Sequence, residues 1–335
     1  MQQLLQHPGY ITRVQGLQIG HYTDTRRPTG CSVVLCPEGA IAGVDVRGAA
    51  PGTRETDLLH PSHLVQQVHG ITLAGGSAWG LEAATGTVRW LEEQGAGLDI
   101  GVGKLPLVPA AVLFDMTMGD MHIRPDSAAG YAACQSASLQ RPAEGSVGAG
   151  AGAVVGKLFG IQRAMKGGIG TASFTVDGVT VGALVACNAL GDVYHPYTGQ
   201  LLAGARTADG MQLLNSRDAL LRGDKPYTLL AGSNTTIGVV ATDARLSKPQ
   251  AQRMATVSHD GLARTINPVH TMSDGDTLFA LATGKASHSL YLMTLFTLAA
   301  EATAVATARA ILMAQPTPVA GQTTLPSWQS WSLHQ

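Results

Sequence analysis

Residues 232–244 read GSNTTIGVVATDA, a short turn that runs directly into an apolar, β-branched segment. The pattern predicts a buried strand over residues 235–243, with Thr235 at its beginning. A hydroxyl residue in that place can become an N-terminal nucleophile if the chain is cut between Asn234 and Thr235. The freed α-amine, whose ordinary pKa is roughly 7.7–8.0, would then serve as its base. An ordinary strand that follows an Asx turn has the same pattern, so this segment alone does not decide between the two interpretations.

Strand and helix patterns occur in mixed order on both sides of this segment. Strands are expected at 32–46, as a hairpin around Pro37-Glu38-Gly39, and at 107–116, 172–176, 179–188 and 275–283. Helices are expected at 57–69, 77–93, 126–138, from Ser247 onward and at 287–314, and a linker is expected at 199–228. Because strict βαβ alternation is missing, this order favours a layered α/β sandwich over a doubly wound parallel sheet.

The composition limits the class of protein. Only 13% of the 335 residues are charged and 41 are glycine, which indicates a large buried core with close backbone packing. The net charge of −1 provides no basic surface, so neither nucleic acid nor a membrane is expected as a partner. No signal peptide is visible at the start of the sequence. Residues 290–313 are apolar, but Glu301 and Arg309 interrupt them, which favours a core helix over a membrane span.

Cysteine and histidine spacings favour no disulfide framework and no metal. The cysteines lack CxxC spacing and are expected to be buried free thiols in a reduced, cytoplasmic setting; they are Cys31, Cys36, Cys134 and Cys187. The histidines form neither HExxH nor HxH, and the cluster His60, His63 and His69 has no cysteine or carboxylate partner in the sequence.

Two glycine-containing segments fail the loop patterns that they resemble. The run Gly145–Gly156 leads to Lys157, but Ala151 and Leu158 do not satisfy GxxxxGK[ST], so a phosphate-binding loop is excluded. Residues 75–80 do not satisfy GxSxG because residue 79 is tryptophan. Lys157 is therefore either presented by a closely packed glycine-rich segment or an ordinary surface lysine.

A second polar segment, HTMSDGDT, lies at residues 270–277, just before an expected strand. Its two carboxylates, Asp274 and Asp276, flank a glycine, and such a turn can aim both at one point. There they could orient an amine or hold a proton. The alternatives are a loop that caps a strand or a weak cation site, although the further ligands of an EF-hand are missing.

Taken together, these segments resemble the DmpA-like aminopeptidase family, which includes β-peptidyl aminopeptidases, a nylon-oligomer hydrolase and a pantetheine hydrolase. Seven blocks carry the resemblance, in order and over most of the chain. They are PTGCSVV (28–34), VDVRGAAPGTRETDLL (44–59), LAGGSAWGLEAATG (73–86), GAGAGAVVGK (148–157), VACNALGDV (185–193), SNTTIGVVATDA (233–244) and HDGLARTINPVHTMSDGDTLFALATG (259–284).

The resemblance implies the fold and its processing. The fold would be an α/β, four-layer αββα sandwich of the N-terminal-nucleophile-hydrolase type, with DmpA/ornithine-acetyltransferase topology, in one domain over residues 1–335. The domain would cut itself into residues 1–234 and 235–335. These two subunits would stay associated and form a homo-oligomer, a tetramer of such pairs. No cofactor is implied.

Carried over residue by residue, the resemblance also implies a catalytic set. Thr235 would be the nucleophile for both self-cleavage and turnover, and Asn188 would donate to the oxyanion. Lys157 matches the lysine near the nucleophile in the nylon-hydrolase branch. Asp274 and Asp276 match the carboxylates that position the nucleophile's amine or the lysine.

The expected activity is that of an autoprocessing aminopeptidase acting on small peptides or amides. Phe114 stands where some family members have a tyrosine, so this part of the substrate site would lack a hydroxyl, and oxyanion stabilisation would rest on Asn188 and backbone amides. The alternatives are an endo-amidase of the nylon-oligomer type, an autoprocessing acyltransferase, and a non-catalytic family member.

Overall fold

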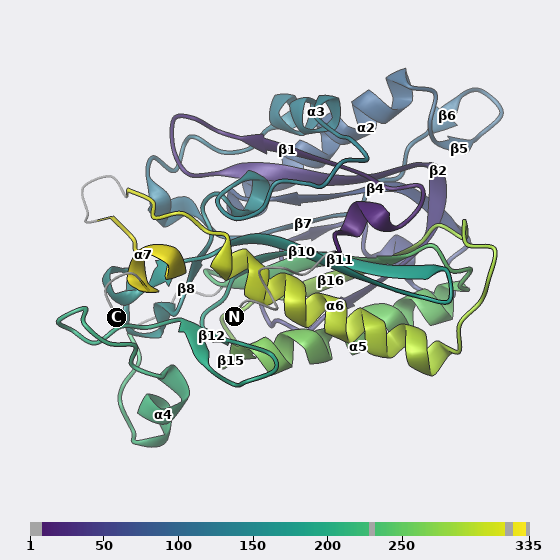
Figure 1. Ribbon diagram of the computed structural model, residues 1–335. Coiled ribbons are helices and arrows are strands. Elements are labelled where there is room, and N and C mark those ends of the chain that lie inside the picture. Colours follow the sequence, from purple (N-terminus) through teal and green to yellow (C-terminus); the bar gives the residue numbers. More distant parts are fainter. Residues whose placement is uncertain (1–8, 228–231, 319–323, 333–335) are drawn as a thin grey trace.

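Apolar side chains alternate along the long strands, so each strand contributes to a different core on each of its faces. On β14 (Thr235–Thr242), Ile237 and Val239 pack into one core and Val240 into another. The same alternation places Val34 of β2 (Gly30–Val46) in the first core and Val33 in a third. Three stacked cores require four layers of secondary structure. The computed structural model, which describes residues 9–227, 232–318 and 324–332, has these four layers, helix–sheet–sheet–helix (Figure 1).

Nine strands form one hydrogen-bonded network, in the order β10-β11-β14-β16-β2-β4-β7-β3, with β1 paired to β2. The long strand β2 links the two sheet layers. Its first half pairs with β1 and β4, and its second half pairs with β16. The remaining strands of the network are β1 (Gln18–Thr23), β3 (Thr53–Arg54), β4 (Gln67–Ala74), β7 (Ala110–Val112), β10 (Gly168–Val176), β11 (Val179–Asn188) and β16 (Thr277–Ala282).

Two helix pairs cover the outer faces of the sheets (Figure 1). The pair α2 (Ala83–Glu93) and α3 (Ser127–Gln135) packs on β1, β2 and β4. The pair α5 (Lys248–Thr265) and α6 (Leu292–Leu312) packs on β10, β11, β16 and the second half of β2.

Shorter elements connect these layers. Small strands are β5 (Leu98–Asp99), β6 (Lys104–Leu105), β8 (Val154–Val155), β9 (Met165–Lys166), β12 (Asp192–Tyr194), β13 (Leu201–Ala203) and β15 (Ile266–Asn267). Short helices are α4 (Ser216–Leu221) and α7 (Trp328–Ser332). The 3₁₀ helices are η1 (Ile11–Arg13), η2 (Asp57–Leu59), η3 (Ser77–Glu82), η4 (Met116–Met118), η5 (Gly148–Gly150), η6 (Lys157–Phe159) and η7 (Ile161–Arg163).

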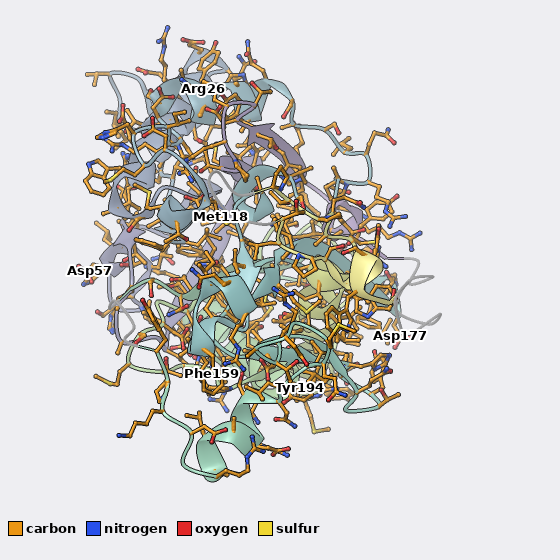
Figure 2. The ribbon with its side chains drawn as sticks, turned by 90° about the vertical axis from the view of Figure 1, so that its left-hand side faces the viewer. Arg26, Asp57, Met118, Phe159, Asp177 and Tyr194 are labelled. Carbon is orange, nitrogen blue, oxygen red and sulfur yellow. The ribbon has the colours of Figure 1, made fainter. Side chains whose placement is uncertain are left out.

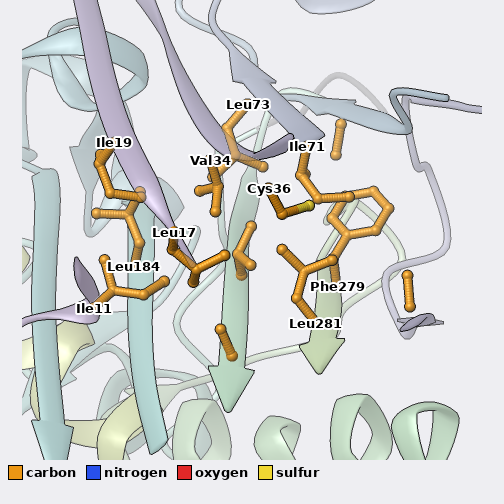
Figure 3. Close-up of a cluster of buried hydrophobic side chains, with 14 of the residues drawn as sticks. Ile11, Leu17, Ile19, Val34, Cys36, Ile71, Leu73, Leu184, Phe279 and Leu281 are labelled. Atoms are coloured by element: carbon orange, nitrogen blue, oxygen red, sulfur yellow. The ribbon is translucent and has the colours of Figure 1, made fainter. Parts of the chain in front are cut away.

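The core between the two sheets is large and almost entirely aliphatic (Figure 3). Phe279 and Leu281 of β16 meet Ile71 and Leu73 of β4 across it, and all four side chains are fully buried. Viewed from the side, side chains fill the space between the layers (Figure 2). This core holds the two sheets face to face, because each sheet presents a continuous apolar surface to the other.

The four-layer αββα sandwich predicted from the sequence is confirmed, as are several of its elements. Ser247 caps α5 with a capping box that includes Gln250, and Asp126 caps α3. The four cysteines are free and buried. The apolar helix predicted near the C-terminus is α6, which is long and apolar enough to cross a membrane, yet 72% of its most apolar window is buried within the protein.

Several element predictions were wrong or too long. Residues 32–46 form no hairpin, because β1, β4 and β16 hold both halves of β2 in one strand and a bulge absorbs Pro37-Glu38-Gly39. Residues 57–69 form only η2 and the start of β4. The strand expected at 107–116 is reduced to β7, and the expected linker at 199–228 contains β13 and α4.

Truncation of Phe279 tests the core between the sheets. F279A should lower the free energy of unfolding by about 3–5 kcal/mol, because it removes a fully buried ring between two sheets. The midpoint of urea unfolding gives this value. L64A, which changes a side chain that is 91% exposed, is the control and should shift the midpoint little. Equal shifts for the two variants would contradict the assignment of this core.

Candidate active site

The register of three strands brings the predicted site residues together. In the antiparallel ladder of β11 and β14, Asn188 lies directly opposite Thr235. The ladder of β14 and β16 is parallel, so the turn that precedes β16 lies beside the beginning of β14. An isolated parallel bridge between Asn234 and Asp274 continues the same register three residues before the first pair of this ladder, Ile237 with Thr277. Residues from separate parts of the chain therefore meet at one edge of the sheet.

The Asn234–Thr235 bond lies at the centre of this edge. Thr235 is 3% exposed and Asn234 is fully buried. The Thr235 hydroxyl donates a short hydrogen bond to the carbonyl oxygen of Asn234. The same oxygen accepts the Gly275 N–H at 2.9 Å. A nucleophilic group therefore touches a carbonyl whose oxygen is already held by a backbone donor.

The Gly275 N–H was not predicted from the sequence, where this glycine was assigned only to a turn. The structure gives a physical reason for glycine at this position. A Cβ atom on residue 275 would lie 2.6 Å from the Ala50 carbonyl oxygen and 3.0 Å from Thr235 Oγ1. Only glycine lets the backbone come this close to the Ala50 carbonyl group and the Thr235 hydroxyl.

Lys157 is held at the same place by three oxygen atoms. Its Nζ donates to the Asn188 carbonyl at 2.9 Å, to Asn188 Oδ1 at 3.0 Å and to the Ser233 carbonyl at 3.1 Å. Among the described residues it has no ion pair. Burial lowers the pKa of Lys157 to about 7, against the opposing effect of the negative charge on Asp274. A substantial fraction of this amine is therefore neutral near pH 7.

Hydrogen bonds link the Asn188 side chain to several other residues of the site. Its Oδ1 accepts the Val154 N–H at 2.9 Å as well as the Lys157 ammonium, and its Nδ2 donates to the Phe114 carbonyl at 3.0 Å. These bonds fix the orientation of the amide. In the uncut chain, Asn188 makes no hydrogen bond to the Asn234 carbonyl. Its predicted role as an oxyanion donor stays a prediction and would use the second N–H of its amide.

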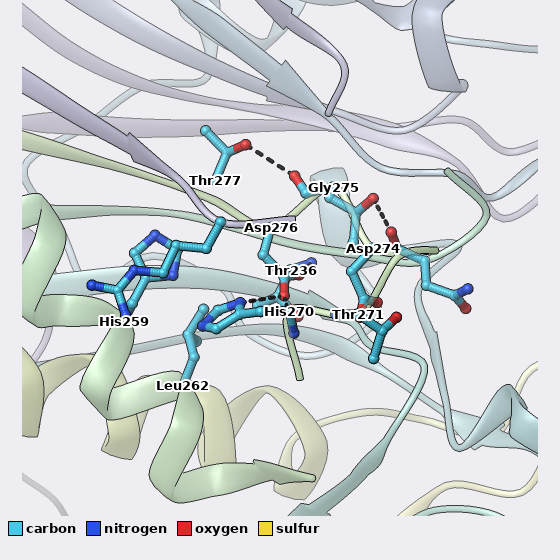
Figure 4. Close-up of polar contacts among 12 residues, drawn as sticks. Thr236, His259, Leu262, His270, Thr271, Asp274, Gly275, Asp276 and Thr277 are labelled. Carbon is cyan, nitrogen blue, oxygen red and sulfur yellow. Dashed lines mark hydrogen bonds and ion pairs between the residues drawn. The ribbon is translucent and has the colours of Figure 1, made fainter. Parts of the chain in front are cut away.

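The two carboxylates, Asp274 and Asp276, lie in the segment just before β16 and are both buried (Figure 4). Asp276 accepts the Thr236 N–H at 2.6 Å on one oxygen and His270 Nδ1 at 2.8 Å on the other. Asp274 accepts the Thr271 N–H at 2.8 Å. Burial, together with the negative charge of Asp276, raises the pKa of Asp274. Asp274 therefore holds a proton more readily than an exposed aspartate does.

A cleft of about 160 Å³ opens beside Ser233 and Asn234. Its lining is mainly apolar, and Lys157 is the one charged side chain among the described lining residues. Phe114 lines this cleft, while its carbonyl group holds Asn188; its predicted contact with a substrate stays a prediction. The other lining residues are Thr117, Gly152, Val154, Gly160, Ile161, Asn188 and Tyr227.

Across the described parts of the chain, no group of three or more histidine, cysteine, aspartate or glutamate side chains is close enough to hold a metal ion. The rings of His60 and His63 are in tilted contact at the surface, with centroids 5.4 Å apart and an interplanar angle of 52°. They lie in a different part of the structure from His69, which is buried and accepts the Leu107 N–H.

Comparison with known proteins matches the chain to a family of peptidases. The model of peptidase family S58 matches residues 9–324. An uncharacterized aminopeptidase of Mycobacterium leprae is 47% identical over 291 residues, which cover 82% of this chain and 78% of the relative. The 6-aminohexanoate-oligomer endohydrolase of Paenarthrobacter ureafaciens is 34% identical over 274 residues, which cover 80% of this chain and 73% of the relative.

A solved structure shows the same fold at low sequence identity. The L-aminopeptidase D-Ala-esterase/amidase of Ochrobactrum anthropi, described as a variant of the Ntn hydrolase fold, superposes with a TM-score of 0.70 at 19% identity. The match covers 97% of this chain and 93% of that structure.

Proposed function

The chain belongs to peptidase family S58 and is a peptide or amide hydrolase of the N-terminal-nucleophile type, and from this premise we propose that Thr235 is its nucleophile. The observation that carries the proposal is the contact between the Thr235 hydroxyl and the Asn234 carbonyl, whose oxygen also accepts the Gly275 N–H. This arrangement matches a hydroxyl group about to attack its own preceding peptide bond. We therefore propose that the chain cuts itself at Asn234–Thr235.

Self-cleavage needs a base other than the Thr235 amine, because that nitrogen is still part of the peptide bond. Lys157 suits this role, since its pKa is about 7 and its Nζ lies 3.1 Å from the Ser233 carbonyl oxygen. Thr235 Oγ1 attacks the Asn234 carbonyl carbon, and its proton passes to Lys157. The C–N bond then breaks and the Thr235 nitrogen takes up a proton. Water hydrolyses the resulting ester, which leaves Thr235 with a free α-amine.

The freed amine then serves as the base for turnover. Thr235 Oγ1 attacks the amide carbonyl of a substrate, the leaving amine takes up a proton, and water releases the acyl group. The Gly275 N–H and the second N–H of Asn188 are the donors that would stabilise the oxyanion. Asp274 and Asp276 would hold the new amine and Lys157 in place.

The substrate class follows from the cleft. We propose small peptides or amides whose acyl part is apolar, because Phe114, Val154 and Ile161 line the space beside the scissile bond. One observation favours a second candidate, endo-hydrolysis of linear amides. No acidic side chain lines the described part of this cleft, so a substrate α-ammonium would find no anionic partner there. The relative from Paenarthrobacter ureafaciens carries the name of such an activity.

Replacement of Thr235 tests both the nucleophile and the cut. Intact mass measurement of the purified protein should show two fragments, one of which begins at Thr235. T235A should remain a single full-length chain because its side chain cannot attack, whereas T235S should be cut more slowly. Thr236 provides the matched control, and T236V should still be cut between residues 234 and 235. Uncut wild-type protein that hydrolyses amides would contradict the proposal.

The pH dependence of self-cleavage tests the role of Lys157. Below pH 7 its amine is protonated and cannot accept the Thr235 proton, so the rate should rise about tenfold per pH unit and level off above about pH 7. The uncut precursor is obtained by synthesis in vitro at pH 5.5, about one and a half units below the pKa of Lys157. It is then shifted to higher pH to start the reaction. K157M should cut itself roughly 10²–10⁴-fold more slowly, and its rate should no longer rise with pH up to about pH 7. K225M, which changes an exposed lysine, is the control, and the pH profile of its self-cleavage should match that of the wild type. An unchanged profile in K157M would rule out Lys157 as the base.

A panel of p-nitroanilides tests the acyl group. Leucyl compounds should be cut at least about tenfold faster, in kcat/KM, than aspartyl or lysyl ones, because the cleft is apolar. F114A should reduce this preference while self-cleavage continues.

Hexanoyl and N-acetylated compounds distinguish the two candidate functions, since preferred cleavage of these compounds favours the endo-amidase. With hydroxylamine added as the acyl acceptor, formation of acyl hydroxamate without free acid would indicate an acyltransferase. No turnover by correctly cut protein would indicate a non-catalytic member.

A further inference from the structure

Two histidines lie behind Asp276, and the reaction proposed above uses neither of them. By the alternation along β16, Asp276 shares the helix-facing side with Leu278, whereas Thr235 shares the opposite side of β14 with Ile237. His270 therefore approaches the site from the side of the helices (Figure 4). It is absent from the residues that line the cleft.

The ring of His270 is held by two neighbours. It meets His259 of α5 edge to face, with ring centroids 4.9 Å apart and an interplanar angle of 68° (Figure 4). His259 Nε2 lies 3.0 Å from the Asp45 carbonyl oxygen, which only accepts, so this nitrogen carries the hydrogen. Burial lowers the pKa of His259 to about 4, so this ring is neutral near pH 7. His259 thus packs beside His270 as a neutral, fixed neighbour.

Two donors of His270 converge on a single oxygen atom of Asp276. The imidazole Nδ1 lies 2.8 Å and the backbone nitrogen 3.1 Å from Asp276 Oδ2. The other oxygen, Oδ1, accepts the N–H of Thr236, the residue that follows the nucleophile, at 2.6 Å. His270 thereby fixes the Asp276 carboxylate, and this carboxylate in turn fixes the beginning of β14.

The backbone of His270 is in the left-handed region, with φ of +56°. This conformation is unfavourable for a residue with a side chain. It is the conformation in which both donors of His270 reach the same oxygen. Strain of this kind persists where the surrounding contacts require it.

We propose that His270 is a positioning residue for Thr235. Its imidazole N–H sets the rotation of the Asp276 carboxylate, which holds the Thr236 N–H and so keeps the Thr235 hydroxyl against the carbonyl that it attacks. His270 touches neither the substrate nor the reacting atoms. The inference rests on the proposed role of Thr235 as nucleophile.

Two substitutions at position 270 distinguish the effect of losing the side-chain donor from the effect of releasing the backbone strain. Glycine adopts a positive φ freely but has no side-chain donor, and asparagine tolerates a positive φ while keeping a short N–H donor. H270G should lower kcat roughly 10²-fold with KM changed less than about twofold, because the hydroxyl is misplaced but the cleft is intact. It should also slow self-cleavage. H270N should keep kcat within about threefold of the wild type.

The control is D177G, which replaces another left-handed residue, φ +48°, in the turn between β10 and β11. It should keep wild-type kcat and self-cleavage. Rates are expressed per active site, counted from the acyl-enzyme burst, so that loss of folded protein does not count as loss of rate.

The outcomes separate this inference from the proposed function. Wild-type kcat in H270G, or equal losses in H270G and H270N, would overturn the positioning role while the inactivity of T235A still supports the nucleophile. Self-cleavage and turnover by T235A would overturn the nucleophile and, with it, the positioning role. Loss in H270G, recovery in H270N and inactivity of T235A together support both.

Discussion

The parallel pairing of β14 with β16 determines where the groups of the site lie. Parallel strands begin at the same edge of a sheet, so the turn before β16 must lie beside the Asn234–Thr235 bond. The helix α5 supplies the crossover that such a pair requires. On the other side, antiparallel β11 ends at this edge and delivers Asn188. A shift of one residue in either ladder would turn Thr235 to the opposite face of its sheet.

The site combines groups that a stable core would ordinarily exclude. Within the described part of the chain, Lys157 donates only to neutral oxygens, and Asp274 and Asp276 are buried close together. Each of these arrangements opposes folding unless other contacts offset it. The apolar core between the sheets lies on one face of these strands, and the core beneath α6 lies on the other. They hold the charged groups in a dry environment, in which small changes of position alter their proton affinities.

Much of the fold follows from local sequence, and what does not follow depends on contacts between distant residues. Continuous apolar, β-branched runs predicted β11 and β14, and Ser247 predicted the beginning of α5, because composition and capping are local properties. The hairpin expected around Pro37 was wrong because β16, more than two hundred residues away in the sequence, pairs with the second half of β2. The helix expected at 57–69 failed for a similar reason, since β4 is a strand through its pairing with β2 and β7.

The same distinction applies to the site. The resemblance supplied Lys157, Asn188, Thr235, Asp274 and Asp276, which the structure brings to one edge of the sheet. Local sequence could not reveal the Gly275 N–H, because a backbone donor has no residue type. His270 was visible in the segment HTMSDGDT, but its bond to Asp276 depends on a left-handed backbone that a single sequence does not report.

The central place of β14 in the sheet has a consequence for how the protein can be assembled. Residues after position 234 provide two adjacent inner strands and the entire α5–α6 layer, while residues before it provide the strands on both sides. An uncut chain can form this arrangement in a unimolecular reaction. Once cut as proposed, unfolded fragments would have to find each other, so refolding would become second order and depend on concentration. Cutting after folding would therefore leave a protein that survives by unfolding slowly, as a kinetically trapped pair of interleaved chains.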